Sequence, residues 1–165
     1  MSAEPNLGAV FDAHVGAEFE TQDVDATMAT MADDPYVWHV PTKMGGDGYD
    51  DVRSFYTSSF VGKWPADTKA EQIGRTVGES CLVEELLMTF THDVQLDVLL
   101  PGVPPTGRRV ELPVVVVMGF EGEKVAFERI YWDQGSLLAQ VGLIDPDDLP
   151  VAPDQARVLR GHLRG

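Results

Sequence analysis

Residues 110–133 read "VELPVVVVMGFEGEKVAFERIYWD", and this stretch decides the fold that we expect. Its two apolar runs, 110–120 and 124–133, are rich in valine and aromatic residues, and the sequence Glu-Gly-Glu separates them. Such runs around a glycine turn are typical of neighbouring β-strands. The same composition upstream predicts three more strands, joined by the turn-like sequences GES and PGVPPTG: 69–78, 81–92 and 94–100.

The chain before these strands has a different periodicity. Apolar residues recur at helical spacings over residues 7–31, and a polar stretch in the middle indicates two helices rather than one. Asp23 or Asp25 is expected to cap the second helix. A short strand over 36–40 follows, and a third amphipathic helix is predicted over 52–62.

Helices followed by a meander of strands predict a single α+β domain. We expect the helices on one face of a curved, mainly antiparallel sheet that wraps around them and encloses a cavity. The domain is expected to span residues 1–144, with a short helix at 135–140. Residues 145–165 are a Pro- and Asp-rich C-terminal extension with a short helix from Asp154. We expect this extension to cover the pocket, to contact a second copy of the chain or to be disordered.

Length and charge restrict the class of protein. A chain of 165 residues that is 44% hydrophobic and 24% charged is typical of one globular domain. The formal net charge of -15 repels phosphate backbones and anionic lipids, so we expect neither nucleic acid nor a membrane as partner. The N-terminus shows no signal-peptide pattern and no apolar run approaches the ~20 residues of a membrane span, so the expected location is cytoplasmic.

The motifs of several enzyme classes are missing from the sequence. The single cysteine, Cys81, stands beside Leu82 and Val83 and is expected to be a buried thiol rather than a nucleophile. The histidines are scattered, without HxH or HExxH, and there is no GxSxG, Walker A or GxGxxG. The sequence "GGDGYDD" lacks the spacing of a dinucleotide site. We therefore expect no metal and no cofactor, which leaves acid/base chemistry or binding without chemistry.

Two histidines are candidate site residues. His39 lies in an apolar strand that ends at a glycine loop, where a pocket mouth is expected, although a lone strand histidine is more often structural. His92 ends the longest predicted strand. Period-two alternation places it on one side with Leu82, Glu84 and Phe90, which describes a pocket wall and a core face equally well.

The same alternation sorts the carboxylates. Glu84 and Glu85 must point to opposite faces, so they are not a catalytic pair of the glycosidase kind. In the last predicted strand, Arg129 and Asp133 share one side, and Glu128 lies on the other side with Ile130 and Trp132.

The sequence "PGVPPTGRRVELPVVVVMGFEGEKVAFERIYWDQGSLLAQVGL" carries a resemblance to a known family. Its "PTGR", the turn "FEGEKV", the E-x-x-x-W-D strand end and "LLAQVGL" resemble the SnoaL-like polyketide cyclases of the nuclear transport factor 2-like superfamily. The helices and "GGDGYDDVRSFY" fit the same pattern, so the resemblance covers about residues 8–144. It implies the cone-shaped α+β barrel, whereas activity varies widely within such a superfamily.

The resemblance also implies a catalytic residue. In these cyclases an Asp at the end of the last strand is the general acid/base of an aldol ring closure that needs no metal or cofactor, and by position this role falls on Asp133. Burial beside Trp132 and Tyr131 would raise the pKa of that carboxyl toward neutral pH. His92 or His39 would then polarise a substrate carbonyl. The competing interpretation is that Asp133 caps the following helix.

Three function classes remain open. The first is a cofactor-independent acid/base enzyme, cyclase-like or isomerase-like, that acts on a small apolar carbonyl compound in a buried pocket. The second is a non-catalytic module of the same fold that binds a ligand or a protein, and the third is a lactone or epoxide hydrolase. We also expect a homodimer through the exposed side of the sheet. Besides the two histidines and Asp133, the following side chains are expected to line the pocket: Trp38, Phe55, Tyr56, Phe90, Tyr131 and Trp132.

Overall fold

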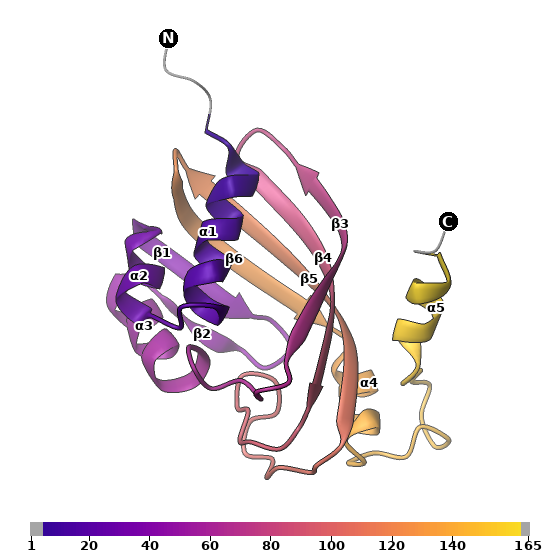
Figure 1. Ribbon diagram of the computed structural model, residues 1–165. Coiled ribbons are helices and arrows are strands. Elements are labelled where there is room, and N and C mark those ends of the chain that lie inside the picture. The colour runs from indigo at the N-terminus through magenta and orange to yellow at the C-terminus, as the bar shows by residue number, and fades with distance from the viewer. Residues whose placement is uncertain (1–4, 163–165) are drawn as a thin grey trace.

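The computed structural model describes residues 5–162, and within them six strands form one curved sheet in the order β2-β1-β6-β5-β4-β3 (Figure 1). All neighbouring strands are antiparallel except β1 and β6, which are parallel. The strands are β1 (Met31–His39), β2 (Met44–Asp47), β3 (Lys69–Val77), β4 (Cys81–Thr91), β5 (Arg109–Glu121) and β6 (Lys124–Trp132).

The helices occupy the positions that the apolar spacing predicts, and Asp23 caps the second of them. They are α1 (Leu7–Phe19), α2 (Val24–Ala29), α3 (Tyr49–Phe55), which continues as a single π-helical turn, η1 (Tyr56–Phe60), and beyond the sheet α4 (Gln134–Gln140) and α5 (Gln155–His162). No helix within residues 5–162 is long and apolar enough to cross a membrane.

The stretch 110–133 forms the hairpin that its composition predicts. β5 and β6 pair with Val116 opposite Ile130, and Gly122 supplies the positive φ of 59° that the turn needs. β1 then adds to the other side of β6, so strands from the two ends of the domain lie next to each other in the sheet. The expected α+β class is confirmed by this arrangement.

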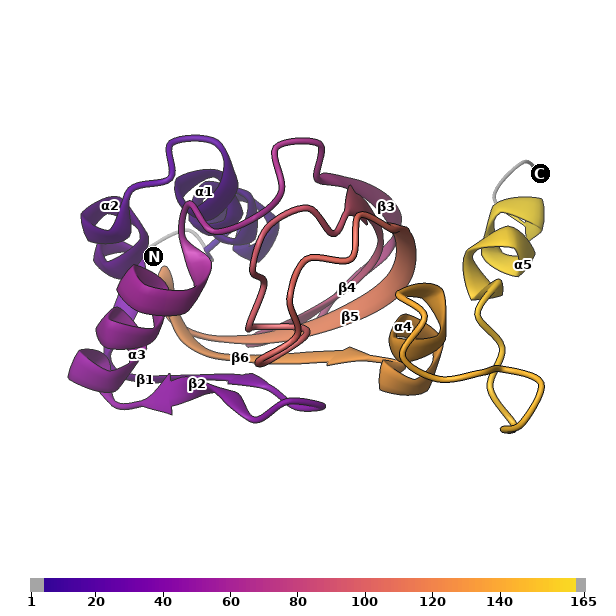
Figure 2. The ribbon, with the colours of Figure 1, turned by 90° about the horizontal axis from the view of Figure 1, so that it is seen from below.

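Helices α1, α2 and α3 cover the concave face of the sheet (Figure 2). The sheet curves around them without closing, because β2 and β3 remain as its two edges. The main core lies between the helices and this face, with Phe11 of α1, Met118 of β5 and Val125 of β6 among its buried residues.

The predicted strand over 94–100 is wrong. These residues form turns, in which Leu100 donates its backbone N–H to the carbonyl of Leu96, and Asp97 accepts from the N–H of Gly102. The segment is apolar because Leu96, Leu99 and Leu100 are buried in the hydrophobic core. A buried apolar segment without a strand partner therefore has the same sequence pattern as a buried strand.

Part of the predicted C-terminal extension packs on the domain. Arg160 of α5 forms an ion pair with Glu111 of β5 at 2.7 Å, and Gln155 donates a hydrogen bond to Asp133 at 2.5 Å. The predicted boundary at residue 144 stays a prediction.

Candidate functional site

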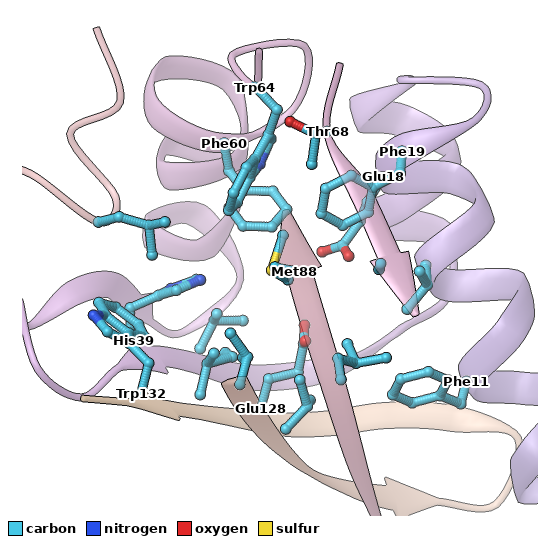
Figure 3. A pocket seen from close by; sticks show the side chains of 18 residues that line it. Phe11, Glu18, Phe19, His39, Phe60, Trp64, Thr68, Met88, Glu128 and Trp132 are labelled. Atoms are coloured by element: carbon cyan, nitrogen blue, oxygen red, sulfur yellow. The ribbon is translucent and has the colours of Figure 1, made fainter. Parts of the chain in front are cut away.

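A cavity of about 190 Å³ lies between α1 and the concave face of the sheet (Figure 3). Its walls are mainly apolar and include Met88 of β4, Val116 of β5 and Ile130 of β6. The lining residues of the sheet centre are buried, whereas Phe19, Trp64 and Thr68 are half-buried. The mouth of the cavity therefore lies between the end of α1 and the segment that leads into β3.

Two carboxylates line this apolar cavity, Glu18 from α1 and Glu128 from β6. Both meet the imidazole of His14, which is fully buried: its Nε2 lies 2.9 Å from Oε1 of Glu128 and 3.3 Å from Oε1 of Glu18. Tyr56 donates its hydroxyl to Oε1 of Glu128 at 2.6 Å. We call these four residues the proton cluster.

Hydrogen bonds around His14 determine where its protons lie. The Thr30 hydroxyl donates to the carbonyl of Thr27, so it can only accept from Nδ1 of His14, 2.6 Å away. Nδ1 therefore carries a proton. Nε2 faces the two carboxylates and carries a second proton when His14 is cationic.

The charges of the proton cluster follow from its pKa values. Burial would lower the pKa of His14, but the charges of Glu128 and Glu18 outweigh burial and raise it to about 10. Burial would raise the pKa of Glu128, but the His14 charge and the hydrogen bonds from His14 and Tyr56 lower it below its usual value. At neutral pH the pair is therefore an imidazolium and a carboxylate.

The pKa of Glu18 is shifted in the opposite direction. Burial raises the pKa of its carboxyl more than the His14 charge lowers it, and the Glu128 charge raises it further. Burial also raises the pKa of Tyr56 well above its usual value, so the phenol stays neutral. The cavity thus presents two neighbouring carboxyls whose pKa values are shifted in opposite directions, an arrangement suited to one proton acceptor and one proton donor.

His39 is a second polar group of the cavity. Its imidazole points into the cavity and lies against the rings of Phe55 and Phe60, each at 5.4 Å between centroids (Figure 3). Burial lowers its pKa to about 4, and the Glu128 charge and the Met44 backbone oppose this only in part, so the ring is neutral. Its Nδ1 has no hydrogen-bond partner in the part of the chain that the structure describes.

Asp133 lies outside the cavity. Its carboxylate is exposed, accepts a hydrogen bond from the backbone N–H of Ser136 and thereby caps α4. The burial expected from its neighbours is not found, because Trp132 turns inward, whereas Tyr131 on the opposite face is 40% exposed.

His92 also lies apart from the cavity. Its Nδ1 accepts from the backbone N–H of Thr106 at 3.3 Å, and its backbone bonds to Gly107 and Arg108. These contacts attach the loop before β5 to the end of β4. Burial lowers the pKa of this histidine, which favours the neutral ring.

The residues expected to line the pocket are distributed over several environments. His39 and Trp132 line the cavity, and Tyr56 reaches its edge through Glu128. Phe55 and Phe90 lie in the core behind it, where Phe90 contacts Trp64 edge-on. Trp38 is half-buried on β1, where it pairs with Arg129, away from the cavity.

Sequence reasoning did not select His14, Glu18 or Glu128, although two signals pointed to them. Strand alternation placed Glu128 on one side with Ile130 and Trp132, the residues that prove to line the cavity. On α1, His14 and Glu18 are four residues apart and extend the stripe of Phe11. An acidic or basic residue on an otherwise apolar stripe is the sequence feature that indicates a buried polar site.

The proton cluster includes the donor set that could hold a metal ion. One ligand atom each of His14, Glu18 and Glu128 lie within 4.8 Å of one another. A metal would have to displace the Nε2 proton of His14, whose pKa is raised to about 10. The hydrogen bonds between these groups already satisfy them without an ion.

Comparison with known proteins places the chain in a family context. The model of the SnoaL-like domain matches residues 11–128. A search of curated protein sequences finds no significant match. Structural similarity is extensive, and three solved structures illustrate it.

A proposed SnoaL-like polyketide cyclase from Jannaschia sp. CCS1 superimposes with a TM-score of 0.65 at 16% identity, over 87% of this chain and 99% of the other. IdmH, a proposed polyketide cyclase from Streptomyces antibioticus, has a TM-score of 0.64 at 16% identity, over 84% and 99%. A protein with a ketosteroid isomerase-like fold from Catenulispora acidiphila, in complex with trimethylamine, has a TM-score of 0.61 at 15% identity, over 86% and 96%. Identities this low show a common fold.

Proposed function

Because the chain belongs to the SnoaL-like domain family, we propose that it is a cofactor-independent enzyme that moves protons on a small apolar carbonyl compound. Glu128 is the base and Glu18 the acid of this proposal. The observation that carries it is the pair of carboxyls with opposite pKa shifts that line one apolar cavity.

Glu128 suits the role of base because it is ionised in a place where water is scarce. A carboxylate in an apolar site costs free energy unless donors replace its water. His14 and Tyr56 supply these donors, both to Oε1. Oε2 has no such partner among the described residues, and it is the oxygen that would accept a proton from a substrate.

The reaction follows from the positions of these groups. Glu128 takes a proton from the carbon next to the carbonyl group, and the electron pair of that C–H bond forms the enol double bond. Glu18 gives its proton to the carbonyl oxygen, so no separated enolate charge develops in the apolar cavity. In an isomerisation, Glu128 then gives its proton to another carbon of the enol, and the enol hydroxyl returns its proton to Glu18. In a ring closure, the enol carbon attacks a second carbonyl carbon, the oxygen of that carbonyl takes the proton from Glu128, and the enol hydroxyl again returns its proton to Glu18.

Deuterium exchange tests the proposal directly. 1-Tetralone, an enolisable bicyclic ketone, is incubated in D₂O with the protein, and loss of its α-proton signal is followed by NMR. We expect Glu128→Gln to lower the enzyme-dependent rate by about 10²–10⁴-fold. The control is Glu85→Gln, because Glu85 is exposed on the other face of the sheet. Equal exchange by Glu128→Gln and wild type would overturn the assignment of Glu128.

A hydrolase is the second candidate, and the convergence of two carboxyls with Tyr56 favours it. Glu128 would take a proton from water while Glu18 protonates the oxygen that leaves an epoxide carbon. A small apolar epoxide in H₂¹⁸O distinguishes the two, because only the hydrolase yields a labelled diol. A protein that binds both probes and turns over neither would be the non-catalytic module.

A further inference from the structure

The cavity has two polar ends, and the proton cluster accounts for only one of them. At the other end His39 is 3% exposed, and its Nδ1 lacks a partner among the described residues. A buried nitrogen without a partner costs free energy that a core residue of the same size would avoid. Its aromatic neighbours offer it no hydrogen bond. The imidazole lines the cavity and points into it, so a bound ligand can form a hydrogen bond with this ring.

The neutral state of His39 restricts the chemistry of that partner. With its pKa lowered to about 4, the ring has one N–H donor and one acceptor nitrogen at neutral pH. It is therefore suited to a neutral hydroxyl or carbonyl group rather than to a carboxylate or an ammonium group. Burial also raises the pKa of Glu18, and the wall between the two ends is apolar.

The size of the cavity restricts the ligand further. Its volume of about 190 Å³ is below the roughly 300–1,000 Å³ of sites that hold drug-sized ligands. The floor of the cavity is built from sheet residues such as Val37 and Val116. Strand pairing fixes the backbone of these residues, so the cavity cannot enlarge on this side. A four-ring polyketide or steroid is larger than this space.

We propose that the substrate is a neutral compound of one or two rings with an oxygen at each end, of which His39 binds the one that does not react. This inference rests on the proposed function for the reacting end, where Glu18 and Glu128 meet the carbonyl group. His39 is then a specificity-determining residue, and its contact with the distal oxygen sets the substrate in line with the proton cluster.

A matched pair of ligands tests this inference. 1-Tetralone and 6-hydroxy-1-tetralone differ by one hydroxyl at the end opposite the ketone, and the cavity residues Trp64 and Trp132 report binding by fluorescence. We expect wild type to bind the hydroxylated ketone about tenfold more tightly. His39→Leu should bind both equally, and His39→Gln, which keeps an N–H and a carbonyl oxygen, should recover part of the difference.

Measurements of thermal stability and of exchange activity distinguish a ligand-binding role of His39 from a structural or a catalytic role. Without ligand, His39→Leu should raise Tm by about 2–4 °C, because it removes the unpartnered nitrogen. A lower Tm for His39→Leu would show that His39 is structural and would overturn the inference. Tenfold discrimination that persists in His39→Leu would also overturn it. The same holds if wild type binds a four-ring ketone such as androstenedione more tightly than the two tetralones. Glu128→Gln should keep the discrimination while losing exchange, so failure of the proposed reaction is distinguishable from failure of the His39 contact.

Discussion

Glu128 remains ionised in the interior because His14 and Tyr56 keep their protons and donate them to its carboxylate in hydrogen bonds. His14 remains cationic up to a pKa of about 10, and Tyr56 has a pKa raised well above its usual value. Burial and the charge on Glu128 in turn raise the pKa of Glu18. The acid and the base are therefore not two independent residues, since the pKa of each depends on the other.

This coupling predicts the pH profile of kcat/KM for ketone exchange. Activity should fall at low pH as Glu128 gains a proton at its lowered pKa, and fall at high pH as Glu18 loses its proton at its raised pKa. Glu18→Gln cannot lose a proton, so its residual activity should lack the alkaline limb. The measurement is exchange at saturating and subsaturating ketone across the pH range. An alkaline limb that persists in Glu18→Gln would assign it to another group.

His14 also predicts how stability depends on pH. Its pKa is raised in the folded state from 6.5 to about 10, so the folded protein holds this proton more firmly than the unfolded chain. The contribution is complete below pH 6.5 and is lost as the pH rises to about 10. Chemical unfolding of wild type should therefore lose roughly 2–5 kcal/mol over this window relative to His14→Gln. Parallel curves for the two proteins would show that His14 is not charged.

The resemblance implies a catalytic role for Asp133, whereas the structure shows it capping α4. Two substitutions distinguish these roles. Asparagine caps helices as well as aspartate, whereas alanine does not. If Asp133 only caps α4, Asp133→Asn should keep stability and exchange activity, and Asp133→Ala should lose about 1 kcal/mol of stability. Loss of exchange by Asp133→Asn would support the catalytic role predicted from the resemblance.

At the scale of elements, the glycines before α3 determine how closely helix and sheet approach. A Cβ on Gly46 of β2 would lie 2.5 Å from backbone atoms of Asp51 and Val52 in α3. The sequence "GGDGYDD", which lacks the spacing of a nucleotide site, thus has a packing role. Because α3 leads directly into η1, this approach also positions Tyr56 in the proton cluster.

Gly46→Ala should therefore be destabilising, since backbone rather than a flexible side chain must move. We expect a loss of about 1–3 kcal/mol in the free energy of unfolding. Gly16→Ala is the matched control, because a Cβ there meets only the end of the Glu20 side chain at 3.8 Å and alanine favours helix. Gly46→Ala with wild-type stability would mean that α3 and β2 adapt freely.

At the scale of the molecule, we propose that the expected homodimer forms through the outer face of the sheet. Side chains that alternate with those of the cavity form it, and they include half-buried Val115, Val117 and Phe127 beside exposed Tyr131. Within residues 5–162, helices α1–α3 cover only the opposite face (Figure 2). An apolar surface of this kind is typical of an interface.

Val117→Glu places a charge at the centre of this face without touching the cavity. We expect wild type to sediment as a dimer and Val117→Glu as a monomer of unchanged fold by circular dichroism. The control Val77→Glu changes an exposed residue at the end of edge strand β3 and should remain dimeric. A monomeric wild type would refute the dimer.

The sequence predicts the fold better than the site, for a physical reason. Periodicity reports which side of an element is buried, and on that basis the hairpin, the α1 stripe and the opposite orientations of Glu84 and Glu85 could be read directly. It does not report which buried faces meet. His14 and Glu128 are 114 positions apart, and only the insertion of β1 beside β6 brings α1 over the last strand.

The parallel pairing of β1 with β6 has a consequence for how the protein is made. As the chain leaves the ribosome, the edge of β1 that pairs with β6 has no partner until Lys124–Trp132 has been synthesised. The backbone N–H and C=O groups of this edge therefore stay unpaired while more than half of the chain is made. Contacts between such distant segments form slowly, because a long loop must close first. We therefore expect the ion pair between His14 and Glu128 to form late in folding. A nascent chain that stops before β6 lacks Glu128 and cannot carry out the proposed chemistry.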